Sequence, residues 1–283
     1  MNTATTIAES VSAAALLLGP HSDSPRLDAE LLLGKILSLS RSALIARSGE
    51  PVAPELRRAY AGMIARRTAG TPVAYLTGSR EFWSMALKVS PAVLVPRPET
   101  ETLIERALQI KYRDQPCSVL DLGTGSGAIA LAIASECPRW QVTGADLSPQ
   151  ALEVAMQNSA QLKLAHIEWR LGCWFDAVPG RRFDLIVANP PYIASADPAL
   201  ANLSQEPDIA LRAGPTGLES LTAIIAHAPL HLHAHGWLLL EHGATQAPDV
   251  AQLLKLRGFA GIRTYPDFAG KPRVTLATFH TQH

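Results

Sequence analysis

The chain has 283 residues, 47% of them apolar, and its 25 basic and 25 acidic side chains give a formal net charge of zero. This length and apolar content can fill a substantial core, while the neutral balance excludes a whole-molecule field that would attract nucleic acid or an anionic membrane. Three widely spaced cysteines and the lack of an apolar run near the roughly 20 residues of a membrane span predict a cytoplasmic protein without disulfides, a zinc site or a membrane anchor.

The first part of the chain has a helical pattern. Apolar side chains recur three or four residues apart, at Leu27 and Leu31 and again at Leu56 and Tyr60. Gly70, Thr71 and Pro72 then interrupt the pattern, as residues beyond a helix end commonly do. We therefore predict a small N-terminal helical domain over residues 1–72.

Residues 73–97 have a different character, because five prolines or glycines divide the surrounding chain into short segments. Within them, Glu81–Trp83 and Leu87–Val89 are spaced to pair as a β-hairpin. The segment is predicted to be a connector that contains this hairpin.

From residue 98 to residue 283, strand patterns alternate with helix patterns, which predicts an α/β domain with a parallel sheet and helices on both faces. The last two strand patterns have no helix between them, so we expect an antiparallel pair at one edge of the sheet. The predicted strands are 118–122, 141–145, 167–171, 184–188, 237–240, 261–265 and 274–279, and helices are predicted from Gly127, from Pro149 and around 218–227.

A glycine-rich loop follows the first of these strands. Glycines at alternate positions allow the backbone to turn tightly and approach a ligand, and the helix that follows presents free N–H groups to an anion such as a methionine carboxylate. Asp146, after the next strand, is placed to accept hydrogen bonds from two ribose hydroxyls, and Trp174 could pack against adenine. The loop residues are Asp121, Leu122, Gly123, Thr124, Gly125, Ser126 and Gly127. These features suit S-adenosylmethionine.

A second motif, Asn189-Pro190-Pro191-Tyr192, ends a later apolar strand. Asn189 can accept one N–H through its side-chain oxygen and Pro190 a second through its backbone carbonyl, so together they can orient a planar NH2 group. Tyr192 offers an aromatic wall beside that group. A carboxamide nitrogen is a poor nucleophile, so this pair of acceptors predicts a site that methylates such a nitrogen without a metal or a strong base.

Other interpretations remain open at this point. The loop also satisfies the G-x-G-x-x-A pattern of nicotinamide oxidoreductases through Gly123, Gly125 and Ala128. In isolation, Asn-Pro-Pro-Tyr is about as often a simple turn at the end of a strand as part of a methyl-acceptor site. If it is only a turn, the protein would be a binding module without catalysis. A histidine cluster over residues 227–235 lacks a partnered cysteine or HExxH pattern and is not predicted to bind metal.

These motifs together resemble those of the release factor glutamine N5-methyltransferases, a family often called HemK or PrmC. The resemblance runs almost from end to end, and the segments that carry it are 70–78, 81–83, 96–101, the loop that starts at Asp121, Asn189–Tyr192 and 236–243. It implies a seven-stranded, Rossmann-like S-adenosylmethionine-dependent methyltransferase domain and an N-terminal helical domain that helps to hold the substrate protein.

The resemblance also implies the reaction and the residues that perform it. The substrate would be the glutamine of the Gly-Gly-Gln motif in class 1 peptide chain release factors, methylated on its side-chain nitrogen. The cofactor would contact Asp121, Gly123, Thr124, Gly125, Ser126, Gly127, Asp146, Trp174 and Asn189. The glutamine would be held by Asn189, Pro190, Pro191 and Tyr192, of which Asn189, Pro190 and Tyr192 would be catalytic.

The sequence departs from the family's usual pattern at two places. Cys173 stands before the tryptophan, where family members often carry an acidic residue, and Ser204-Gln205-Glu206-Pro207 stands where many have Arg-Phe-Glu-Pro. An adenine N6 methyltransferase of DNA or RNA is the main alternative, because an aromatic amino group needs the same two acceptors. The neutral charge argues against it, since nucleic-acid enzymes usually cluster Lys and Arg against phosphates.

Overall fold

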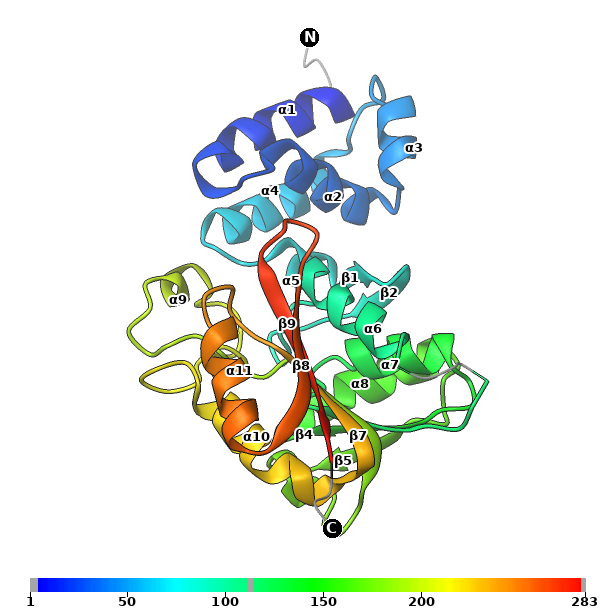
Figure 1. Cartoon of the computed structure of the whole chain (residues 1–283). Coiled ribbons are helices and arrows are strands. Elements are labelled where there is room, and N and C mark those ends of the chain that lie inside the picture. Colours follow the sequence, from blue (N-terminus) through cyan, green and yellow to red (C-terminus); the bar gives the residue numbers. More distant parts are fainter. Residues whose placement is uncertain (1–4, 111–113, 281–283) are drawn as a thin grey trace. The chain divides into compact units, whose positions relative to one another are not determined.

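The computed structural model describes residues 5–110 and 114–280 of the chain (Figure 1). The chain forms two compact units that meet in sequence between Ser79 and Arg80. The connector predicted over residues 73–97 is therefore divided between them.

The first unit is helical. Its helices are α1 (Ile7–Leu18), α2 (Pro25–Leu37), α3 (Arg41–Ala46), α4 (Pro54–Thr68) and α5 (Val73–Thr77), with a short 3₁₀ helix η1 (Gly19–His21) after α1. Thr6 begins α1 with a reciprocal cap, in which its hydroxyl accepts the Glu9 N–H at 3.2 Å and its own N–H donates to the Glu9 carboxylate at 2.8 Å. Buried apolar side chains from all five helices form one core.

The second unit contains a two-stranded hairpin, β1 (Ser79–Phe82) with β2 (Met85–Lys88), and a seven-stranded sheet. The order across the large sheet is β5-β4-β3-β6-β7-β9-β8, and all neighbours are parallel except β7 with β9 and β9 with β8. Its strands are β3 (Ser118–Leu122), β4 (Gln141–Asp146), β5 (Glu168–Leu171), β6 (Phe183–Ala188), β7 (Leu232–Glu241), β8 (Phe259–Pro266) and β9 (Pro272–Phe279).

Helices cover both faces of this sheet (Figure 1). The helices of this unit are η2 (Pro98–Thr100), α6 (Glu101–Ala107), α7 (Ala128–Glu136), α8 (Pro149–Gln161), η3 (Trp174–Ala177), α9 (Ala199–Asn202), η4 (Asp208–Ala210), α10 (Glu219–His231) and α11 (Ala247–Leu256), of which α9 and η4 lie in the segment after β6 rather than on the sheet. Alternate strand residues point to opposite faces, so Val187 packs with α6 and α7 while Ile186 packs with α10 and α11. The central strand β6 therefore ends in a continuous buried apolar run, Leu185–Ala188, as expected of a strand that is covered on both sides.

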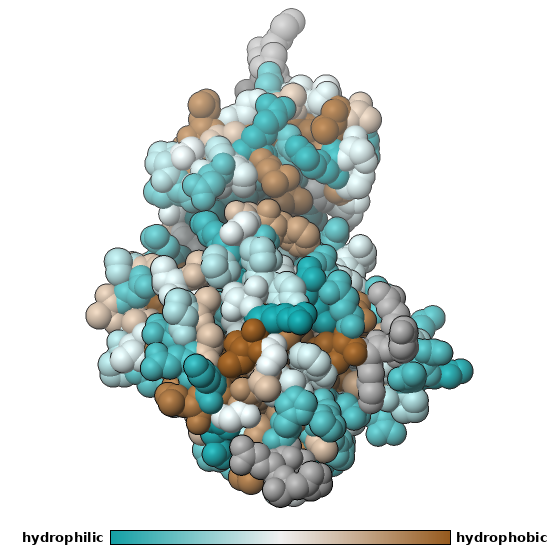
Figure 2. Space-filling view, viewed as in Figure 1, coloured by the Kyte–Doolittle hydropathy of each residue, from teal (hydrophilic) through white to brown (hydrophobic). Residues whose placement is uncertain are grey.

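The surface in the view of Figure 2 is mostly hydrophilic, with apolar side chains in small separate groups. The most exposed large apolar residues are Leu16, Leu256 and Phe268, at 82%, 77% and 73%. Across the described residues, no helix combines the length and the apolarity that a membrane crossing requires.

The predicted fold class is confirmed, and a strand lies at each of the seven predicted positions, with bounds that differ at most of them. The tail forms the antiparallel pair expected at an edge, with β8 outermost. Helices α6 and α11 were not predicted. In addition, α10 continues to His231 and passes directly into β7, which begins at Leu232 rather than at Trp237. The histidine cluster therefore lies on a helix and a strand, and no three potential ligands gather as a metal site within the described ranges.

Candidate active site

The glycine-rich loop joins β3 to α7 and has a conformation that needs glycine. Gly123, Gly125 and Gly127 all have positive φ, at +71°, +56° and +81°. A Cβ at Gly127 would also lie 3.0 Å from the Trp169 ring and 3.1 Å from the side chain of Leu131. Side chains at these positions would be strained, and one at Gly127 would also collide with its neighbours.

Backbone hydrogen bonds fasten the loop to the end of β4. The N–H groups of Gly123 and Thr124 both donate to the Ala145 carbonyl, at 2.8 and 3.0 Å. The Gly125 N–H donates to the Asp146 carboxylate at 2.8 Å, and the Ser148 N–H donates to its other oxygen at 2.9 Å. Burial raises the pKa of Asp146 and these bonds oppose the rise. A carboxylate has about four acceptor sites, so Asp146 retains acceptors for further donors.

Asp121 supports the loop from inside the fold. It is fully buried, and one of its oxygens accepts the Thr124 hydroxyl at 2.6 Å and the Ala130 N–H at 3.2 Å. Its other oxygen has no hydrogen-bond partner among the described residues. Burial raises the pKa of Asp121 to about 7, and the negative charge of Asp146 adds to this rise. The two hydrogen bonds act in the opposite direction and lower the pKa.

Trp174 begins η3, shortly after β5, with a positive φ of +46°. Its ring lies close to the glycine loop, because a Cβ built on Gly123 would be 3.4 Å from the ring atom Cζ3. The neighbouring Cys173 is exposed. The indole therefore forms a flat wall beside the loop, close enough to Gly123 that a Cβ there would be in van der Waals contact with the ring.

Asn189-Pro190-Pro191-Tyr192 follows β6. The Asn189 side-chain nitrogen donates to the Thr100 hydroxyl at 3.1 Å, and Thr100 is the last residue of η2. The Tyr192 carbonyl accepts a hydrogen bond from Gln246 at 3.1 Å. Burial, assisted by the negative charge of Glu241, raises the pKa of the Tyr192 phenol to about 12, so the ring stays neutral.

A buried carboxylate organises the loops beside this motif. Glu206 accepts the Val95 N–H at 3.0 Å and pairs with Arg97, while only 7% of it is exposed. Farther along, Ile193 and Arg212 form a short parallel bridge. Glu206, which belongs to the Ser204–Pro207 run, thereby joins segment 193–213 to segment 90–97, and the two segments form one wall.

These elements enclose a cavity of about 260 Å³ at the carboxyl ends of the parallel strands. The sheet order reverses direction between β3 and β6, and such a switch point is where α/β sheets bind ligands. The predicted site residues on its wall are Gly123, Thr124, Gly125, Ser126, Asp146, Trp174, Asn189 and Pro191. Asp121, Gly127, Pro190 and Tyr192 are not on the wall.

Two further polar residues, which sequence analysis did not assign to the site, lie directly behind Asn189. Thr100 is 4% exposed and accepts the hydrogen bond from the Asn189 side chain, and Glu241 is 1% exposed at the end of β7, next to the end of β6, where Ala188 pairs with Leu240. The sequence contained a signal for Glu241, because it is a carboxylate directly after the apolar run Leu238–Leu240. An acid in that position is buried by the strand and must have partners.

Sequence comparison decides the family. Residues 9–78 match the family described as PrmC N-terminal domain, and residues 100–206 match the methyltransferase small domain. The chain is 48% identical to "Release factor glutamine methyltransferase" of Pseudomonas aeruginosa over 259 residues, which is 91% of this chain and 94% of that protein. The chain belongs to the release factor glutamine methyltransferase family.

A second member of the release factor glutamine methyltransferase family is similar to this chain over nearly its whole length. The protein of that name from Salmonella typhimurium is 44% identical, with 91% of this chain and 94% of the relative aligned. Solved structures with lower identity show the same fold. A Thermus thermophilus 16S rRNA N2 G1207 methyltransferase, in complex with AdoMet and guanosine, superposes with a TM-score of 0.55 at 19% identity, covering 71% of this chain and 50% of that one.

Proposed function

We propose that this protein transfers a methyl group from S-adenosylmethionine to the side-chain nitrogen of the glutamine in the Gly-Gly-Gln motif of class 1 release factors. The observation that carries the proposal is that Asn189 lies on the wall of the same cavity as the glycine loop, Asp146 and Trp174. The names of the relatives, over nine tenths of the chain, support the same substrate.

The residues on one side of the cavity fit the cofactor. The loop leaves open space at Gly125, where nothing lies within 4 Å of the place a Cβ would take, and the α7 N-terminus offers backbone N–H groups to a carboxylate. Asp146 has acceptor sites left for ribose hydroxyls, and the Trp174 ring offers a flat apolar surface for adenine. When bound there, S-adenosylmethionine supplies an electrophilic methyl group on a sulfonium.

Asn189 and the residues after it suit the acceptor. The Asn189 Oδ1 and the Pro190 carbonyl each accept one N–H of the glutamine carboxamide, which orients the nitrogen lone pair towards the methyl group. Tyr192 contributes a neutral aromatic ring beside them. Orientation matters because the nitrogen is a weak nucleophile and gains reactivity chiefly from being held in line with the methyl group.

The helical first unit has a proposed role of its own. A release factor is a large substrate that offers surface well beyond its glutamine loop. We infer that residues 1–72 help to hold it, which fits the match of residues 9–78 to the PrmC N-terminal domain. Contacts remote from the reacting group can position that group and so raise turnover.

A methyl-transfer assay with labelled S-adenosylmethionine tests this function. The acceptors are a class 1 release factor, the same factor with its Gly-Gly-Gln glutamine changed to alanine, and adenine-containing DNA and RNA. We expect label only in the unaltered factor. Label in the nucleic acids alone would replace the proposal with an adenine N6 methyltransferase, and label in the altered factor would place the methyl group elsewhere.

A further inference from the structure

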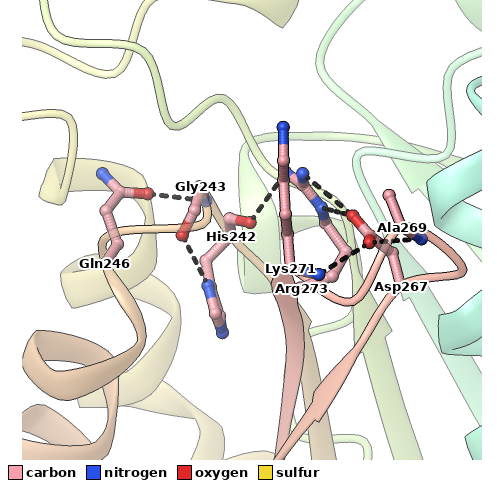
Figure 3. Close-up of polar contacts among 7 residues, drawn as sticks. All are labelled: His242, Gly243, Gln246, Asp267, Ala269, Lys271 and Arg273. Carbon is pink, nitrogen blue, oxygen red and sulfur yellow. Dashed lines mark hydrogen bonds and ion pairs between the residues drawn. The ribbon is translucent and has the colours of Figure 1, made fainter.

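Gln246 is a half-buried side chain that the reaction described above does not use. It stands at the start of α11 and makes three hydrogen bonds to backbone groups through its amide. The Gly243 N–H donates to its Oε1 atom at 2.9 Å (Figure 3), and its Nε2 atom donates to the carbonyls of Tyr192 and Gly217, each at 3.1 Å. One amide therefore joins the turn after β7 and the loop before α10 to the acceptor segment, Asn189–Tyr192.

The three partners allow only one orientation of this amide. A backbone N–H can only donate and a backbone carbonyl can only accept. If the Gln246 amide were turned by 180°, its NH2 group would meet the Gly243 N–H and its oxygen would meet the two carbonyls. Both hydrogens of Nε2 are therefore committed, one to the Tyr192 carbonyl and one to the Gly217 carbonyl.

The turn that carries Gly243 is itself tied to the sheet. His242 is fully buried, and its N–H donates to the Arg273 carbonyl of β9 at 3.0 Å. Arg273 donates back to the His242 carbonyl at 3.3 Å and is held by Asp267 at 3.2 Å (Figure 3). The Gly243 carbonyl accepts the Gln246 N–H at 2.9 Å. Gln246 thus reaches the acceptor segment from a base that is fixed to β7 and β9.

The acceptor segment needs such support because its two central residues are prolines. Pro190 and Pro191 have no N–H to donate, so their own backbone donors cannot hold this part of the chain. The segment is held near its two ends instead. The Asn189 side chain donates to a hydroxyl of η2 at 3.1 Å, and the Tyr192 carbonyl accepts from Gln246. Between these points lies the Pro190 carbonyl, which in the proposed function accepts an N–H of the glutamine.

Gly217 allows the loop before α10 to lie directly against the same carbonyl. Its φ is +81°, and a Cβ on it would be 2.7 Å from the Tyr192 carbonyl oxygen and 3.0 Å from the Gln246 Nε2 atom. Glycine permits this close approach of one backbone to another. A side chain at position 217 would push the Tyr192 carbonyl away from its donor.

We propose that Gln246 is a positioning residue that anchors the far end of the acceptor segment and so places the Pro190 carbonyl and the Tyr192 ring for the carboxamide. The bond that does this joins residues 54 positions apart in the chain. The proposal rests on the proposed function for its catalytic meaning, whereas the anchor itself is a property of the free protein.

Gln246→Glu tests the anchor with little change of shape. The carboxylate keeps an acceptor for the Gly243 N–H but turns an oxygen without a hydrogen towards the two carbonyls. At high pH we expect at least a tenfold lower kcat with release factor, and a Kd for S-adenosylmethionine changed by less than about threefold. Protonation restores one donor, so the ratio of wild-type to variant kcat should shrink as the pH falls. An unchanged kcat, or a loss that is the same at every pH, would overturn the proposal.

Gly217→Ala and Gly258→Ala form a matched pair of variants. Both glycines have positive φ, at +81° and +87°, so both variants carry similar backbone strain, but a Cβ on Gly258 would meet nothing within 4 Å. We expect Gly217→Ala to lower kcat at least tenfold and Gly258→Ala to leave it within about twofold of the wild type. Equal kcat in the two folded variants would overturn the proposal.

A further measurement is independent of the substrate. In the free protein, the N–H groups of Ile193 and Ser195 donate to backbone carbonyls at 3.0 and 2.8 Å, and their hydrogen–deuterium exchange is followed by mass spectrometry. We expect the peptide that covers residues 192–195 to exchange faster in Gln246→Glu than in the wild type. Equal rates would overturn the anchor, whereas slow exchange in a wild-type protein that fails to methylate release factor would contradict only the proposed function.

Discussion

Asn189 combines two tasks at the residue scale, because it lies on the wall of the cavity while its side-chain nitrogen donates to the Thr100 hydroxyl at 3.1 Å. Sequence analysis predicted Asn189, Asp146 and Trp174 from the chemistry of ligands that they could contact. It did not assign Thr100, which tertiary packing brings to Asn189 from 89 positions away in the chain. Contacts of that range are not encoded in any local pattern.

For Asn189→Ala we expect a turnover at least about two powers of ten below that of the wild type. The glutamine amide loses one of its two acceptors and with it the orientation of its lone pair. Steady-state kinetics with a release factor measures the loss, and an unchanged melting temperature shows that the fold is intact. Near-normal kcat in the folded variant would refute the two-acceptor mechanism.

Asp146→Ala should weaken cofactor binding by about 10- to 100-fold, since the ribose hydroxyls lose a charged acceptor. Isothermal calorimetry with S-adenosylmethionine measures the change. Glu153→Ala, which removes an exposed carboxylate from α8, is the control and should bind normally. Equal affinity in both variants would move the ribose contact to another residue.

At the element scale, the strands of the parallel sheet were predictable because their apolar runs end in glycine or polar residues. Helix α11 was not predicted, although Val250 and Leu254 are buried four residues apart on it as an amphipathic helix requires. The start of β7 was missed for a physical reason: α10 passes into it without a turn, and residues 233–235 are exposed, two of them histidines.

Asn158 links separate elements around the cofactor loop. On α8 and fully buried, it accepts the Lys88 N–H at 2.7 Å and donates to the carbonyls of Lys88 at 3.0 Å and Ser126 at 2.9 Å. For Asn158→Ala we expect a loss of about 2–4 kcal/mol in the free energy of unfolding, because buried backbone groups are left unpaired. Urea denaturation measures it.

Gln161→Ala is the control for this prediction. Gln161 lies on the same helix and donates to the Ala86 carbonyl of the same hairpin at 2.9 Å, but it is exposed, so water can replace it. Its loss should cost under about 1 kcal/mol. If both variants unfold alike, the buried link contributes no more than a surface hydrogen bond.

At the scale of the whole molecule, the buried carboxyls of Asp121 and Glu241, both with a raised pKa, make the free energy of unfolding depend on pH. Burial raises the pKa of Asp121 from 3.8 to about 7, so between these values the folded state binds more protons than the unfolded state. The contribution of Asp121 to stability is therefore present at low pH and is lost as the pH rises through about 7.

Asp121→Asn isolates this effect. We expect the free energy of unfolding of the wild type, minus that of the variant, to fall from about pH 4 to about pH 7 and then to level off. Denaturation at several pH values measures the difference. A difference that rises with pH over this range would show that the carboxylate is stabilised, with a lowered pKa, by its hydrogen bonds to Thr124 and Ala130.

The fold class and the family were within reach of the sequence, because several motifs occur in the right order along the whole chain. The boundaries predicted at residues 72 and 97 stay predictions, as does the substrate-holding role of the first part. The structure divides the chain between Ser79 and Arg80. A short helix such as α5, which follows Pro72, has too few residues for a period to be recognised.

The most direct test of the central claim is tandem mass spectrometry of the Gly-Gly-Gln peptide from a release factor incubated with S-adenosylmethionine and this protein. The account predicts one added methyl group, located by fragmentation on the side-chain nitrogen of the glutamine, and none when Asn189→Ala replaces the wild type. An unmodified glutamine with the wild-type protein, while the cofactor is bound, would contradict it.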